Sequence, residues 1–227
     1  MDDPRNEGTD PASAPHDRPP ARTPWKTREG RVISLVSRKG GVGKTTSAVN
    51  LGAALALSGH EVLVVGTDPQ CGVCRTLGAA PEDMPQGLSD IYDRGTLLMD
   101  LAQSSPLPGL SYVSPRVLTL DEEEDYLENL DREPELFVLG IDRARSRYDT
   151  ILIDCPSSLG APTRAALLAS DGYLVPIQAE ELCRNSIDPL LEFVETFRDR
   201  SQLPPVPGIP NLHTLPCRSK RPPLTLE

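Results

Sequence analysis

V-I-S-L-V-S-R-K-G-G-V-G-K-T-T, residues 32–46, is the stretch that decides the fold of this 227-residue chain. It begins with Val32–Val36, an apolar run rich in β-branched side chains, which predicts a short buried strand. A glycine-rich turn follows directly, and residues 44–58 then carry apolar side chains at roughly helical spacing. The stretch therefore predicts a strand, a phosphate-binding loop and a helix in that order.

The loop contains the donors that a phosphate group requires. Three glycines, Gly40, Gly41 and Gly43, are expected to adopt backbone conformations barred to other residues, so that N–H groups can point inward at a phosphate. The N-terminus of the helix favours the same anion. Lys44 adds a full positive charge for the β- and γ-phosphates, and the Thr45 hydroxyl suits a magnesium ion. We therefore expect ATP and Mg²⁺ to bind here. The expected cofactor-binding residues are Gly40, Gly41, Val42, Gly43, Lys44, Thr45 and Thr46.

The rest of the chain alternates strands with helices. Further strands are expected at Glu61–Val65, Leu110–Ser114, Thr150–Asp154 and Tyr173–Ile177. Helices are expected at Pro134–Arg147, Pro162–Ala169 and Ser186–Arg200. This alternation predicts the α/β fold of a P-loop NTPase, with a mostly parallel sheet covered by helices on both faces.

Proline marks the expected limits of the folded domain. Thirteen of the 24 prolines fall in residues 1–30 or 204–227. We therefore expect a disordered arm over 1–30, one domain over 31–200 and an irregular proline-rich tail over 201–227, which leaves the sheet incomplete at its C-terminal end.

Charge and composition narrow the function classes. The net charge of −10 opposes attraction to DNA, which we expect this chain to bind only weakly. Residues 121–135 contain nine acids and one arginine, and they form either a solvated helix face or loop, or an acidic docking site.

Without an apolar span or a signal peptide, we expect a cytoplasmic protein that makes no membrane contact. The odd number of cysteines, five, favours reduced thiols.

The octapeptide K-G-G-V-G-K-T-T at residues 39–46 resembles the deviant Walker A signature of the ParA/MinD family of ATPases. The resemblance covers about residues 31–200, and the lack of an amphipathic terminal helix favours its ParA side. It implies that Lys39 reaches the phosphates of a partner subunit across a nucleotide-sandwich homodimer. Lys39 is thereby expected to stabilise charge in trans during phosphoryl transfer.

Two further motifs follow in the order of that family. V-V-G-T-D-P-Q, residues 64–70, resembles the switch I segment, where Asp68 would position or activate the attacking water. Gly66 replaces the first acid of that motif, which puts the rate of hydrolysis in question. T-I-L-I-D-C-P, residues 150–156, resembles the Walker B and switch II segment, whose acid, Asp154, would hold magnesium together with Thr45. The expected catalytic residues are Lys39, Lys44 and Asp68.

The resemblance implies an ATPase that hydrolyses ATP to position DNA or cargo, is stimulated by a ParB-like activator and associates with the nucleoid. Two alternatives stay open: a nucleotide-binding switch or scaffold with little hydrolysis, and a defective truncated fragment. Cys71 and Cys74 form a C-G-V-C pair directly after Gln70, in what is expected to be a loop. They are interpreted as variant loop residues, a redox pair or a metal pair.

Overall fold

The computed structural model describes residues 30–178, 184–200 and 216–217. The expected arm lies outside these residues apart from Gly30, and so does the expected tail apart from residues 216–217. None of the helices in the described part combines the length and the apolar character that a membrane span requires.

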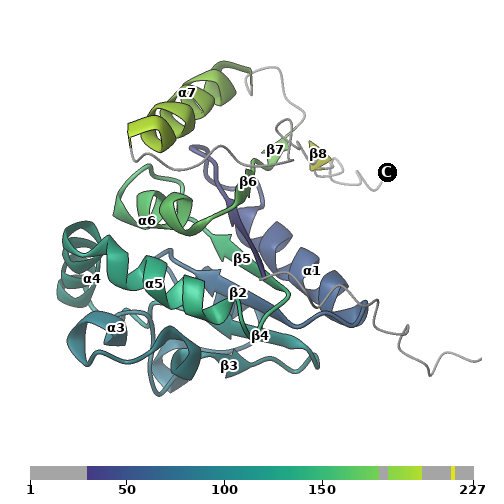
Figure 1. Cartoon of the computed structure of the whole chain (residues 1–227), viewed down its shortest axis with the longest axis vertical. Coiled ribbons are helices and arrows are strands. Elements are labelled where there is room, and N and C mark those ends of the chain that lie inside the picture. The colour runs from purple at the N-terminus through teal and green to yellow at the C-terminus, as the bar shows by residue number, and fades with distance from the viewer. Residues whose placement is uncertain (1–29, 179–183, 201–215, 218–227) are drawn as a thin grey trace, which may run out of the picture.

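A six-stranded sheet forms the centre of the described residues, in the order β3-β4-β2-β5-β1-β6 (Figure 1). All its neighbouring strands pair in parallel except β3 and β4. The strands are β1 (Arg31–Leu35), β2 (Val62–Gly66), β3 (Gln103–Ser104), β4 (Leu110–Val113), β5 (Thr150–Asp154) and β6 (Gly172–Leu174). A separate parallel pair joins β7 (Ile177–Gln178) to β8 (Pro216–Cys217).

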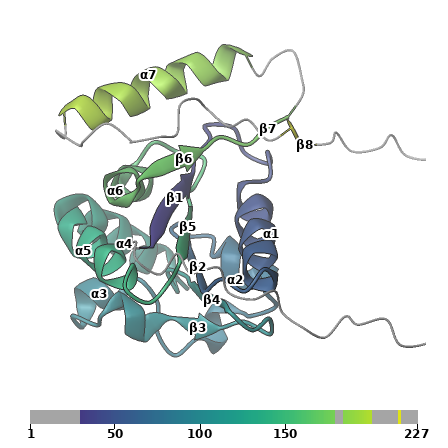
Figure 2. The same ribbon diagram turned by 45° about the vertical axis from the view of Figure 1, so that its right-hand side comes forward.

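Helices cover both faces of the sheet, as the alternation predicted. The α-helices are α1 (Lys44–Leu57), α2 (Gly72–Thr76), α3 (Asp90–Asp93), α4 (Leu120–Arg132), α5 (Pro134–Ala144), α6 (Ala161–Ala169) and α7 (Arg184–Arg200). Short 3₁₀ turns occupy Pro81–Asp83 and Leu98–Leu101. Figure 2 shows α1 and α2 on one face and α3 to α6 on the other. Each face has its own apolar core, since alternate side chains of a strand point to opposite sides.

The strand register brings the motifs together at one edge of the sheet. Leu35, the last residue of β1, is level with Asp154, and Gly66, the last residue of β2, is level with the same Asp154. Since β5 lies between β1 and β2, the segments that follow these three strands leave the sheet side by side. The carboxyl ends of parallel strands are where α/β proteins of this kind bind ligands.

The expectation of one strand at Tyr173–Ile177 is wrong in part. The run divides into β6, which pairs with β1, and β7, which pairs with β8. Pro176 lies in the break between them, and it cannot donate a backbone hydrogen bond to a neighbouring strand. Apolar character alone therefore overstated the length of the strand.

The acidic stretch forms α4 and the first residues of α5. A capping box begins α4: the Thr119 hydroxyl accepts from the Glu122 N–H, and the Glu122 carboxylate accepts from the Thr119 N–H. Tyr126 and Leu130 are the buried residues of this helix, which is described throughout, and most of its acids are exposed. The helix-face interpretation is thus confirmed, while docking of a partner on it stays a hypothesis.

Candidate nucleotide-binding site

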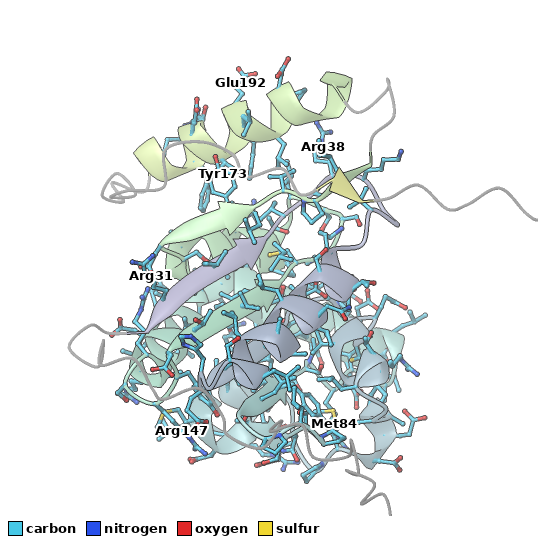
Figure 3. The ribbon with its side chains drawn as sticks, turned by 90° about the vertical axis from the view of Figure 1, so that its right-hand side faces the viewer. Arg31, Arg38, Met84, Arg147, Tyr173 and Glu192 are labelled. Atoms are coloured by element: carbon cyan, nitrogen blue, oxygen red, sulfur yellow. The ribbon has the colours of Figure 1, made fainter. Side chains whose placement is uncertain are left out.

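The P-loop occupies the turn between β1 and α1, and two of its glycines have a conformation that other residues rarely adopt. Gly41 has φ +72° and Gly43 has φ +90°. Gly40 is not in that region, and a side chain there would only touch Ser157 at an ordinary 3.7 Å. The expectation that all three glycines need this freedom is therefore wrong for Gly40. Arg38 stands where a Walker A loop usually has its first glycine. Its side chain is exposed, and it lies at the opposite end of β1 from Arg31 (Figure 3).

The N-terminus of α1 is free to receive an anion. Gly43 caps the helix without a side-chain hydrogen bond, and the first turn carries no acidic residue. Val42 is buried, with 2% of its surface exposed, so it can offer a ligand only its backbone. Thr46, in the first turn, is exposed. These features leave the N–H groups and partial positive charge of the helix end available for a phosphate group.

Lys44 is the cation at the centre of the site. It is buried, and its Nζ donates a hydrogen bond of 2.8 Å to Ser157 Oγ in the segment after β5. Burial lowers the pKa of Lys44, while the nearby carboxylates of Asp154 and Asp68 raise it. A buried ammonium group in this position gains most from an additional anion. Ser157 was not predicted, because only the fold brings it to Lys44.

Thr45 and Asp154 form a pair at the level of the strand ends. The Thr45 hydroxyl donates a 2.6 Å hydrogen bond to Asp154 Oδ2. The other carboxylate oxygen, Oδ1, is buried and has no hydrogen-bond partner among the described residues. Burial raises the pKa of Asp154 to about 6, and the Thr45 hydrogen bond and Lys44 lower it. A hydroxyl beside an unsatisfied buried carboxylate oxygen is a donor set that fits hydrated Mg²⁺.

Asp68 lies two residues beyond the end of β2. It is half-buried, its Oδ1 accepts a 3.0 Å hydrogen bond from the Gln70 N–H, and its carbonyl accepts from the Cys71 N–H at 2.9 Å. Its charge acts on both Lys44 and Asp154. The structure thus brings Lys44, Asp68 and Asp154 into one electrostatic group. Lys39 is partly buried in the same loop, and its expected action on a partner subunit stays a proposal.

Only one cysteine of the C-G-V-C pair lies in the expected loop. Cys71 precedes α2 with φ 54°, and Cys74 is inside that helix. Both are buried free thiols, and burial raises the pKa of Cys71. The described residues contain no group of three or more His, Cys, Asp or Glu side chains placed to hold a metal ion. Cys155 is also buried, and burial raises its pKa.

Gly66, in place of the first switch I acid, is closely packed. An added Cβ would lie 2.9 Å from Val73 Cγ2 and 3.1 Å from Val73 Cβ, and Val73 is fully buried in α2. The same Cβ would be 3.5 Å from the hydroxyl of Ser114, which is buried and has no hydrogen-bond partner within the described part of the chain. Val73 therefore occupies the space that the side chain of an acid at position 66 would need.

We expect Gly66→Ala to lower the free energy of unfolding by about 1 kcal/mol, because the added methyl group overpacks the site against Val73. This loss should exceed the gain that alanine gives by restricting the unfolded chain. With Val73→Ala added, the loss should be smaller than the sum of the two single losses. Urea unfolding of the four proteins measures both quantities. Gly40→Ala, which adds a methyl group without a close contact, is the matched control. Additive losses would contradict the steric coupling.

A parallel sheet whose first strand passes through a glycine-rich loop into a helix, with an acid at the end of the adjacent strand, defines the P-loop NTPase class. A family model described as an AAA domain matches residues 30–204. The chain belongs to the ParA/MinD family within this class, which confirms the resemblance of its motifs.

Two curated relatives illustrate the match. The sporulation initiation inhibitor protein Soj of Bacillus subtilis is 35% identical over 73% of this chain and 65% of the relative. The chromosome partitioning protein ParA of Caulobacter vibrioides is 36% identical over 74% of this chain and 63% of the relative. The chain thus spans slightly less than two thirds of the length of these relatives.

Solved structures share the fold. Cobyrinic acid a,c-diamide synthase from Mycobacterium smegmatis, with a bound ATP analogue and magnesium, matches with a TM-score of 0.67 and 25% identity over 75% of this chain and 69% of that chain. The septum site-determining protein MinD from Pyrococcus horikoshii, complexed with Mg-ADP, matches with a TM-score of 0.63 and 24% identity over 82% of this chain and 81% of that chain.

Proposed function

We propose that this chain is a ParA-like ATPase. It binds Mg-ATP, dimerises with the nucleotide between two subunits, and hydrolyses ATP to position DNA or cargo at the nucleoid under the control of a ParB-like activator. The observation that carries the proposal is the group formed by Lys44, Thr45 and Asp154, in which a buried cation and an unsatisfied carboxylate oxygen lie at the N-terminus of α1.

Each residue then has a role that its position supports. The P-loop N–H groups and Lys44 hold the phosphates, and Thr45 with Asp154 hold Mg²⁺, which when bound supplies neutralising charge to the phosphates. Asp68 orients the attacking water, since it is held beside Lys44 and Asp154 without being hydrogen-bonded to either in the described structure. Lys39 acts on the phosphates of the second subunit.

A nucleotide-binding switch with little hydrolysis is the second candidate, and the packing of Val73 against Gly66 favours it. Turnover of ATP by the purified chain, with and without a ParB-like partner from the same organism, separates the two candidates. Light scattering with ATP, and with ADP as the control, tests the dimer. Absence of turnover under both conditions would refute the ATPase proposal, and absence of ATP binding would refute both candidates.

We expect Asp154→Asn to raise the free energy of unfolding in the absence of nucleotide by about 1–3 kcal/mol, because it removes a buried charge whose pKa is raised by burial. The same variant should lose the additional stabilisation that Mg²⁺ gives over ATP alone. Thermal unfolding with ATP, with and without EDTA, measures this difference. Asp188→Asn, an exposed site on α7, is the control. A variant that retains the full magnesium effect would exclude Asp154 as the metal residue.

We expect this chain with ATP to bind duplex DNA only weakly, with a Kd above about 1 μM at 0.15 M salt. The reason is the net charge of −10, since non-specific affinity depends on Lys and Arg contacts to DNA phosphates. Fluorescence anisotropy against a random duplex measures this, with a longer ParA relative as the comparison. Submicromolar, ATP-dependent binding would show that a basic surface has been overlooked.

A further inference from the structure

Tyr126 is the point at which the acidic helix α4 reaches the nucleotide site. Only 1% of its surface is exposed, and it is among the largest fully buried side chains of the described residues. Its hydroxyl donates a 3.2 Å hydrogen bond to the carbonyl of Thr67, which is 59 residues earlier in the sequence. Thr67 lies between the end of β2 and Asp68. One tyrosine hydroxyl therefore joins α4 to the segment that carries the proposed catalytic acid.

Thr67 is held from both sides. Its N–H and its hydroxyl both donate to the carbonyl of Asp154, at 2.9 and 3.0 Å. These two bonds hold the N–H and the side chain of Thr67 at the end of β5, and the bond from Tyr126 holds its carbonyl. The carbonyl of Thr67 and the N–H of Asp68 belong to one planar peptide group. The orientation of that peptide plane, and with it the start of the Asp68 segment, is set by the Tyr126 hydroxyl.

We propose that Tyr126 is a positioning residue for ATP hydrolysis, which holds Asp68 in place through the Thr67–Asp68 peptide. The proposal rests on the proposed function for the role of Asp68, while the geometry of the contact stands independently of it. Burial holds the pKa of Tyr126 well above its usual range, with Asp68 among the negative charges that add to this effect. The hydroxyl therefore remains a donor at every pH at which the protein would work.

Two other tyrosines show that burial alone does not give this contact. The hydroxyls of Tyr92 and Tyr148 are buried, yet neither has a hydrogen-bond partner within the described residues. Tyr148 is 2% exposed, almost as buried as Tyr126, and it lies just before β5 at the opposite end of that strand from Asp154. Removal of its hydroxyl breaks no hydrogen bond of the described structure. Tyr148→Phe is therefore a matched control for Tyr126→Phe.

The test compares the two phenylalanine variants in the full chain. Tyr126→Phe should lower kcat for ATP by about tenfold and leave KM within about twofold, because the water-directing group is displaced while the phosphate contacts remain. Amide hydrogen exchange of residues 66–72, measured without nucleotide, should become about tenfold faster. Tyr148→Phe should change neither. Unchanged exchange in Tyr126→Phe, or unchanged turnover where the parent chain is active, overturns the proposal.

A double variant separates positioning from general loss of structure. In an Asp68→Ala background, Tyr126→Phe should cause no further fall in the residual turnover, since its effect passes through Asp68. A further fall of the same size, or faster exchange spread over all of α4 and β2 with a lost thermal transition, would show a structural role and overturn the proposal. If the parent chain does not hydrolyse ATP, the proposed function fails, and the exchange measurement still decides whether Tyr126 holds this segment.

Discussion

Lys44→Ala is expected to weaken ATP binding by at least about a hundredfold, because the loop loses the buried cation that is proposed to hold the β- and γ-phosphates. Lys44 is buried and its pKa is lowered by burial, so its ammonium group is poorly solvated before ATP arrives. The added phosphate charge compensates that cost. The N-terminus of α1 alone supplies only a partial charge.

The measurement for Lys44→Ala is the ATP-induced rise in melting temperature. A ligand at a hundred times its Kd stabilises a protein by about 2.7 kcal/mol, so a hundredfold loss of affinity removes most of the rise. Arg75→Ala, which removes an exposed cation from the last turn of α2, is the control and should keep it. An undiminished rise in Lys44→Ala would refute the assignment of the phosphate loop.

The central strands and the phosphate loop could be predicted because their signals are local. Val32–Val36 and Thr150–Asp154 are short apolar runs, and each becomes a buried strand displaced by at most one residue. Gly41 and Gly43 have the positive φ angles that a glycine-rich loop suggests. The proximity of Asp154 to the loop also followed from sequence, because the carboxyl ends of parallel strands share one edge of a sheet.

The contacts that complete the site could not be predicted, because each joins segments that are far apart in the chain. Ser157 lies 113 residues from Lys44, and Tyr126 lies 59 residues from Thr67. No spacing rule places a hydroxyl at such a distance. The acidity of α4 also concealed Tyr126, since a stretch with nine acids suggests a solvated face and gives no sign of a buried donor.

The replacement of the first switch I acid was visible in sequence, but its consequence was not. Gly66 alone suggests a simple loss of a carboxylate. The structure adds that Val73 fills the space and that the Ser114 hydroxyl faces the same place without a partner in the described chain. The Cβ of an aspartate at position 66 would already lie 2.9 Å from Val73 Cγ2, closer than a side chain can be accommodated without movement of Val73. In the proposed ATPase mechanism, Asp68 is therefore the one acid of this motif that remains to act in hydrolysis.

Asp68→Ala is expected to lower kcat for ATP by about a hundredfold while binding of ATP is retained, because the proposed role of the carboxylate is to act on the attacking water in the transition state and not on the bound phosphates. Binding should be unchanged or slightly tighter. Asp68 adds negative charge near the position of the phosphates, as its effect on Lys44 and Asp154 shows. Single-turnover hydrolysis and the ATP-induced shift in melting temperature measure the two quantities separately.

Asp68→Asn distinguishes chemistry from loop structure. An asparagine keeps an oxygen that can accept from the Gln70 N–H, so it preserves the local turn, but it carries no charge and is a poor proton acceptor. If Asp68 acts on water, Asp68→Asn and Asp68→Ala should have similarly low values of kcat. The control is Asp83→Ala, which removes an exposed acid beyond α2 and should leave kcat at the value of the parent chain. If Asn retains the parent rate, Asp68 serves only to shape the turn before α2, and hydrolysis must depend on another group.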